Sequence, residues 1–284
     1  MWPRARARQP FFARLSRPAR TIRAMPLTFP AHQGPVLPLK MLRPNWFDAT
    51  ALVIGASSPD LVQGLVHVDG VTSHSMTGVL VFAVPFTVIC ATILRRGAAD
   101  GLFGSLPDLG PLRLHSYRVL SSRRPHLIVT VTSAVIGAAS HVFIDSFTHA
   151  GRWGTNLLGL NQRVDTPTGV HSIAKLLQYL GHSVGSIVSV AVFAWVARRF
   201  LPQWYSDTDI AGARARPVAP DAGHRTSIIL ALSVLAGSIW SLQPDIAPVF
   251  SIGAFFTLGL LAAGVANKLA SPRRAGANAA GTTS

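Results

Sequence analysis

Three side chains that can bind a metal follow one another at four-residue intervals near the end of an apolar run. They are His141, Asp145 and His149, in the run that begins at Leu127. Residues four apart share one face of a helix, so these three form a polar stripe. Imidazole nitrogen and carboxylate oxygen are ligands of zinc and similar divalent ions. Ionisable groups in an apolar span are costly, which favours a metal or catalytic site over a His–Asp pair that only fixes helix packing.

Further possible ligands lie in the N-terminal part of the chain. Asp60 ends the string Ser57-Ser58-Pro59-Asp60, and His74 lies in Ser73-His74-Ser75 just before an apolar run. Taken alone, Asp60 could be a turn or helix-cap residue and His74 an interfacial histidine. If the N-terminal segment folds as a hairpin, however, all these donors reach the same membrane face. We therefore expect one site formed by His32, Asp60, His74, His141, Asp145 and His149, with His182 as a peripheral candidate.

Composition indicates a membrane protein. Of the 284 residues, 49% are hydrophobic and only 13% are charged, whereas soluble domains have about 25% charged residues. Such hydrophobicity excludes disorder for most of the chain. The single cysteine, Cys90, excludes a disulfide framework and argues against a cysteine zinc site. All 11 acidic residues are Asp, which excludes the H-E-x-x-H zinc-protease helix.

Apolar runs predict the membrane spans. A helix needs about 20 apolar residues to cross a bilayer. Five runs meet or approach this length, and the third is extended by the mixed segment 173–183: residues 77–94, 127–147, 184–196, 226–242 and 246–266. Two shorter stretches, 31–42 and 49–66, precede them. We predict an all-α polytopic membrane helix bundle of about five full spans plus an N-terminal helical hairpin formed by these two stretches. The alternative is that 49–66 crosses the membrane.

Lysine and arginine are distributed unequally between the predicted loops. The segments 95–126 and 197–225 and the C-terminal tail hold 14 of them, and the opposite loops hold only Arg152, Arg163 and Lys175. Such an excess marks the cytoplasmic side. The sequence thus predicts a multi-pass protein of the inner (cytoplasmic) membrane, with a cytoplasmic C-terminus and an extracytoplasmic His/Asp site.

The same reasoning divides the chain. Seven arginines precede Met25. They would lie outside if the hairpin does not cross, so we interpret 1–24 as a disordered basic extension or mis-assigned start. An amphipathic anchor to anionic lipid is the alternative. We expect a membrane domain at 25–200, a cytoplasmic loop at 201–225, a two-helix membrane hairpin at 226–268 and a disordered tail at 269–284. The net charge of +15 fits membrane orientation, so the bilayer is the expected partner and nucleic acid is not.

Several strings together resemble a known family. They are Met25-Pro26-Leu27-Thr28-Phe29-Pro30-Ala31-His32, Val36-Leu37-Pro38-Leu39, Ala51-Leu52-Val53-Ile54-Gly55 with Pro59-Asp60, Ser73-His74-Ser75, His141-x3-Asp145-x2-Thr148-His149 and Lys175-Leu176-Leu177-Gln178. Over roughly 25–199 the chain resembles a family of bacterial membrane proteins known only as a domain of unknown function. That family is similar to the predicted inner-membrane metal-dependent hydrolases and distantly to zinc-dependent phospholipase C. The resemblance implies ligands at His32, Asp60, His74, His141 and Asp145, and less strongly at His149.

The leading hypothesis is a membrane-bound metal-dependent hydrolase. The three histidines His32, His74 and His141 would bind a divalent metal such as zinc, and Asp60 and Asp145 would supply oxygen ligands or the general base. A site at the membrane surface suits a phosphoester or lipid-linked substrate. Two alternatives stay open: a transporter or proton/ion-pathway protein, and a non-catalytic structural or assembly protein.

Overall fold

The computed structural model describes residues 28–66, 69–243 and 247–271. The predicted extension at 1–24 lies outside these residues, as does the predicted tail from 272 onward. The first helices are short: α1 (Thr28–Ala31), α2 (Leu37–Leu42), α3 (Ala49–Gly55), α4 (Ser58–Val66), α5 (Gly70–Ser73) and α6 (Met76–Gly78), which begins the first long apolar segment. The later helices are α7 (Val84–Ile93), α8 (Ala99–Ser105), α9 (Leu127–Thr148), α10 (Trp153–Leu157), α11 (Ile173–Trp195), α12 (Leu201–Trp204), α13 (Asp207–Arg214), α14 (Ala222–Trp240) and α15 (Pro248–Ala270).

Five continuous helical segments of the described chain are long and apolar enough to cross a membrane: Met76–Ser105, Leu127–Thr148, Ile173–Trp204, Ala222–Trp240 and Pro248–Ala270. They confirm the predicted all-α polytopic fold. The third is 32 residues long, because the helix includes the mixed segment 173–183 and also continues past the predicted end at Val196 to Trp204. The first extends past the predicted end at Leu94 to Ser105, through Arg95. The chain tolerates this arginine because its guanidinium pairs with the buried carboxylate of Asp48.

The N-terminal hairpin differs from the prediction. Residues 31–42 do not form one helix, since a turn around Gly34 and Pro35 separates α1 from α2. The stretch 49–66 is also broken, because α3 and α4 meet at an angle of 54°. Pro59 has no N–H to donate and so begins a helix more readily than it continues one. This bent pair has the geometry of either a broken span or a re-entrant loop.

Small residues bring α3 close to α9. A Cβ added at Gly137 would lie 2.5 Å from the carbonyl oxygen of Leu52, and one at Gly55 would lie 2.8 Å from that of Ala134. Side chains as small as alanine fill the remaining contact between α3, α7 and α9. Helix pairs in membranes commonly approach through such residues. The last turn of α3 therefore lies directly against the middle of α9.

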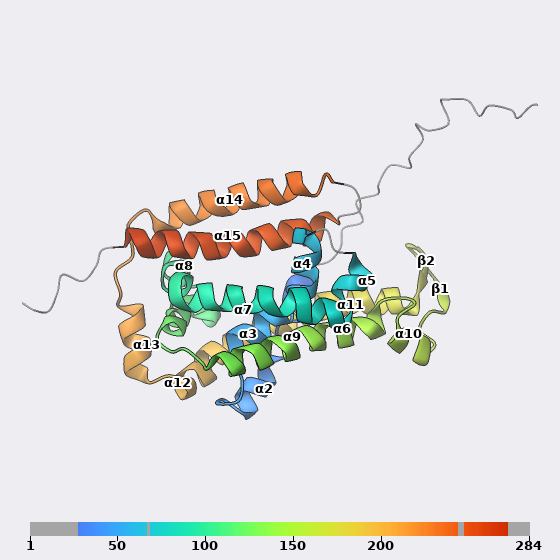
Figure 1. The fold of residues 1–284 in the computed structure, drawn as a ribbon, viewed down its shortest axis with the longest axis horizontal. Coiled ribbons are helices and arrows are strands. Elements are labelled where there is room, and N and C mark those ends of the chain that lie inside the picture. The colour runs from blue at the N-terminus through green and yellow to red at the C-terminus, as the bar shows by residue number, and fades with distance from the viewer. Residues whose placement is uncertain (1–27, 67–68, 244–246, 272–284) are drawn as a thin grey trace, which may run out of the picture.

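The two ends of the bundle carry different elements (Figure 1). One end holds α12 and α13. The other holds α10 and a two-stranded antiparallel hairpin of β1 (Arg163–Thr166) and β2 (Gly169–Ser172), which the sequence analysis does not foresee. The helices α14 and α15 lie side by side along one flank. Because α9 runs from the first end to the second, its polar stripe lies beside α10.

Candidate metal centre

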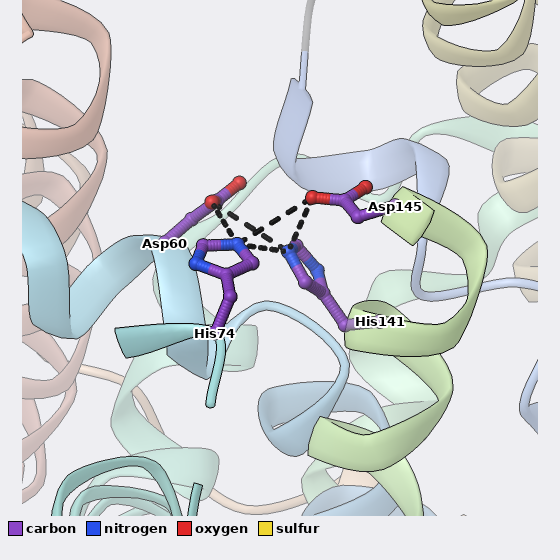
Figure 2. Close-up of side chains that lie close together, drawn as sticks. All are labelled: Asp60, His74, His141 and Asp145. Atoms are coloured by element: carbon purple, nitrogen blue, oxygen red, sulfur yellow. Dashed lines mark hydrogen bonds and ion pairs between the residues drawn. The ribbon is translucent and has the colours of Figure 1, made fainter. Parts of the chain in front are cut away.

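Four side chains from three separate segments converge near the end of α9 (Figure 2). Asp60 comes from α4, His74 from the turn before α6, and His141 and Asp145 from α9. All four are buried, and one possible ligand atom from each lies within 4.8 Å of the others. Figure 2 shows the two carboxylates pointing toward the facing imidazole rings. The structure thus brings together four of the six residues expected at the site.

Five of the six separations between these atoms match those around a tetrahedral divalent ion of the size of zinc. Ligands 2.0–2.2 Å from a tetrahedral centre are about 3.3–3.6 Å from one another. The Nε2 atoms of His74 and His141 are 3.2 Å apart. His74 Nε2 lies 3.3 Å from Asp60 Oδ1 and 3.4 Å from Asp145 Oδ2. His141 Nε2 lies 3.5 Å from Asp60 Oδ1 and 3.3 Å from Asp145 Oδ2.

A backbone carbonyl orients His141. Its Nδ1 lies 2.8 Å from the carbonyl oxygen of Ala56, at the break between α3 and α4. A carbonyl only accepts, so Nδ1 must carry the proton and donate it. In the neutral ring, Nε2 then presents a lone pair toward the other three side chains. Such a bond from the far nitrogen to a carbonyl is the usual support of a metal-binding histidine.

Local turns present Asp60 and His74. The carbonyl of Ser57 accepts a hydrogen bond from the N–H of Leu61 at 3.1 Å. This bond closes the first turn of α4, which begins at Ser58 and contains Asp60. For His74, the following Ser75 caps α6 by accepting from the N–H of Gly78 at 3.0 Å. The hydroxyl of Ser73 lies 2.8 Å from His74 Nδ1.

His32 lies beside the four-residue cluster. Its ring centroid is 4.2 Å from that of His141, and its Nε2 is 3.6 Å from Asp145 Oδ1. Neither ring nitrogen of His32 nor this carboxylate oxygen has a hydrogen-bond partner among the described residues. Burial lowers the pKa of His32 to about 3, so the ring is neutral at physiological pH. Buried donors and acceptors without protein partners can hold a water molecule or a ligand group.

His149 lies at the rim of the cluster. Its Nδ1 is 3.6 Å from Asp145 Oδ2, and its side chain is 34% exposed. Its Nε2 lies 2.7 Å from the amide nitrogen of Gln178, whose oxygen accepts from Lys175 Nζ at 2.6 Å. Lys175 and Gln178 were not predicted at the site, because they stood out only as part of the family resemblance. Their three-residue spacing at the start of an apolar helix was the available signal, because it places both on one face.

His182 occupies a second position behind His32. The two ring centroids are 6.0 Å apart, and His182 Nδ1 has no hydrogen-bond partner among the described residues.

Two histidines outside the membrane-spanning helices have shifted pKa values. Burial lowers the pKa of His149. His74, also outside them, differs: burial alone would lower its pKa, but hydrogen bonds with Asp145 and Asp60 raise it.

The donor set fits a divalent cation. Two imidazoles and two carboxylates form a borderline set of N and O ligands, which suits zinc. Two anionic carboxylates held close together in a buried site repel each other unless a positive charge lies between them. Protons on the histidines or a divalent metal can provide that charge. The cluster can therefore bind a metal ion.

A model of a family described as a domain of unknown function, DUF4184, matches residues 25–267. The chain belongs to this family. The resemblance stated above ended near residue 199, so the match extends it over α14 and α15. No curated protein and no solved structure matches the chain. These comparisons give no support to the predicted similarity to metal-dependent hydrolases.

Proposed function

We propose that this member of the DUF4184 family is a membrane-bound, zinc-dependent hydrolase that acts on a phosphoester or lipid-linked substrate. The observation that supports it best is the set of five ligand-atom separations between 3.2 and 3.5 Å. Asp60, His74, His141 and Asp145 would hold the ion. When bound, a divalent ion polarises a phosphoryl or acyl oxygen and lowers the pKa of bound water toward about 7.

The chain's own residues suit hydrolysis in one further respect. Structural zinc sites use four protein ligands, whereas catalytic sites leave one position to water. Here Asp145 Oδ1 and neutral His32 face each other at 3.6 Å, without hydrogen-bond partners among the described residues. A water placed between them could give a proton to the carboxylate or to the imidazole. Asp145, or His32 in its place, would then act as the general base. Because four protein ligands are typical of a structural site, hydrolysis would require one carboxylate, Asp60 or Asp145, to leave the ligand set and free a position for water.

The position of the cluster supports a substrate at the membrane surface. Asp145 lies near the end of α9, a helix of 22 residues that spans about 33 Å. The bilayer core is about 30 Å thick, so this end reaches the headgroup level. The excess of arginine at the opposite end supports assigning this end to the extracytoplasmic side of an inner-membrane protein.

Metal content and hydrolysis test the proposal together. The wild-type chain, purified in detergent and loaded with zinc, is expected to hold one ion and to hydrolyse a fluorescent phospholipid or bis(p-nitrophenyl) phosphate. The double variant His141→Ala with Asp145→Ala should lose both properties. The control His171→Ala alters a histidine on β2, outside the cluster, and should retain them. Background metal content in the wild type would refute the metal site. Bound zinc without turnover would refute hydrolysis and favour a structural role, especially if chelators lower the melting temperature.

A further inference from the structure

A second polar cavity lies at the other end of the bundle. It has a volume of about 280 Å³, and its cationic lining residues are Lys40, Arg95, Arg123 and Arg124. None of the described residues that line it is acidic. Asp48, which contacts Arg95 from behind the lining, offsets one of the four charges, and the exposed Asp209, 3.9 Å from Arg123, offsets part of a second. A net charge between about +2 and +3 therefore faces this cavity.

Buried donors in this cavity lack partners. The Nε atom of Arg95, whose side chain is 8% exposed, has no hydrogen-bond partner among the described residues. The same holds for the indole nitrogen of Trp204, which also lines the cavity. Lys40 Nζ donates to the carbonyl oxygen of Phe47 at 2.9 Å and to that of Pro44, and an ammonium group has three donors. Donors and positive charge together are what a phosphate group binds.

An apolar cavity adjoins the cationic one. It has a volume of about 410 Å³, within the range of ligand pockets, and aliphatic and aromatic side chains form most of its wall. Ala49, Leu120 and Trp204 line both cavities, so the two meet there. Val190 of α11 also lines the apolar cavity and is 51% exposed, which gives a hydrocarbon chain access from the lipid-facing surface.

We propose that this end of the bundle holds one anionic phospholipid, with its phosphate in the cationic cavity and an acyl chain in the apolar cavity. A free phosphate would occupy only the cationic cavity. The contact between the two cavities at Ala49 suits a molecule with a polar head and an apolar tail. Basic pockets between helices on the arginine-rich side are typical sites for anionic headgroups.

This lipid is distinct from any substrate of the metal centre. Val129 lines the cationic cavity, and His141 lies twelve residues later on α9. At 1.5 Å per residue, the phosphate would lie about 18 Å from the metal ligands along the helix. The inference therefore does not depend on the proposed hydrolysis.

Native mass spectrometry of the detergent-solubilised chain tests this site, with dioleoyl phosphatidylglycerol, dioleoyl phosphatidylcholine and inorganic phosphate as probes. We expect one phosphatidylglycerol per chain and weaker binding of phosphatidylcholine. Each cationic residue contributes roughly fivefold to affinity for an anionic headgroup. Lys40→Gln with Arg124→Gln should therefore weaken phosphatidylglycerol binding roughly 25-fold. The control Arg198→Gln with Arg199→Gln removes two exposed charges that do not line the cavity and should change it less than about twofold.

A blocking variant tests the acyl chain. Ala49→Phe places a ring where the two cavities meet and should reduce lipid binding at least as strongly as the charge variant. Equal binding of the two lipids, or equal effects of the charge variant and its control, would overturn the proposal. Inorganic phosphate that competes fully with phosphatidylglycerol, with no effect of Ala49→Phe, would show a free-anion site instead. If Ala49→Phe does not fold, as judged by its melting curve, the charge variants alone decide the question, since Lys40 and Arg124 are not buried.

Discussion

Replacing Gly137 with alanine is expected to weaken metal binding, although Gly137 contacts no ligand atom of the site. The added Cβ would lie 2.5 Å from the carbonyl oxygen of Leu52 and 3.0 Å from the N–H of Ala56, whereas ordinary contacts begin at 3.4 Å. Both neighbours are backbone atoms of α3 and the residue after it, so no side chain can rotate away. The backbone must retreat by about 0.9 Å.

That retreat would break the support of His141. Its Nδ1 lies 2.8 Å from the carbonyl oxygen of Ala56, and a retreat of that size in this direction would lengthen the separation to about 3.7 Å. Loss of such a partner typically lowers metal affinity 10- to 100-fold. Overpacking costs roughly 1–3 kcal/mol, against a gain of about 1 kcal/mol from replacing a helical glycine. We therefore expect a net loss of stability of up to about 2 kcal/mol.

Gly181 provides a matched control. It lies in α11, where an added Cβ would meet nothing within 4 Å. Gly181→Ala should leave metal affinity unchanged and stabilise the helix by up to about 1 kcal/mol. Competition with a fluorescent zinc chelator gives the affinity, and circular dichroism gives the melting temperature. A folded Gly137→Ala variant with wild-type zinc affinity, or an equal loss in Gly181→Ala, would refute the reasoning.

Three further predictions concern charge. In the metal-free protein, the pKa of His74 lies above 6.5, because hydrogen bonds to two carboxylates outweigh the effect of burial. Protonated His74 therefore stabilises the folded state fully below pH 6.5. This stabilisation is lost as the pH rises through the pKa that His74 has in the folded protein. Zinc must displace this proton; its affinity should therefore rise with pH from about 6 to 8, and calorimetry showing no pH dependence would contradict this. Asp145→Asn keeps the shape of a proposed ligand but removes its anionic oxygen. Zinc at 100 times its Kd should stabilise the wild type by about 2.7 kcal/mol in a melting assay, and the variant should lose most of this stabilisation. A zinc-induced rise in melting temperature as large as that of the wild type would exclude Asp145 as a ligand. Asp48→Ala leaves the buried guanidinium of Arg95 unpaired and should cost roughly 3–5 kcal/mol of unfolding free energy. Asp209→Ala removes an exposed partner of Arg123 and should cost less than about 1 kcal/mol; equal effects in denaturant titrations would be contrary evidence.

Local patterns were sufficient to predict much of the bundle. The apolar runs located all five long helices, because the need to bury about 20 apolar residues in lipid acts on consecutive positions. The four-residue spacing of His141 and Asp145 also predicted their shared face, since helix periodicity is independent of the rest of the fold. The end of the first span was predicted too early, at Leu94, because only a partner 47 residues away in sequence makes a buried arginine acceptable at position 95.

The sequence by itself determined that this is a polytopic helical chain whose second long apolar run, 127–147, carries a His–Asp pair, since hydropathy and periodicity follow from neighbouring residues. The tertiary structure decided that Asp60 and His74 lie against this pair while His32 and His149 flank it. Such convergence depends on the close approach of α3 and α9 at Gly55 and Gly137 and on the break before Pro59. The cationic cavity likewise depends on packing, because Lys40 of α2, Arg95 of the first long helix and Arg123 of the segment before α9 are distant in sequence and meet only in the folded bundle.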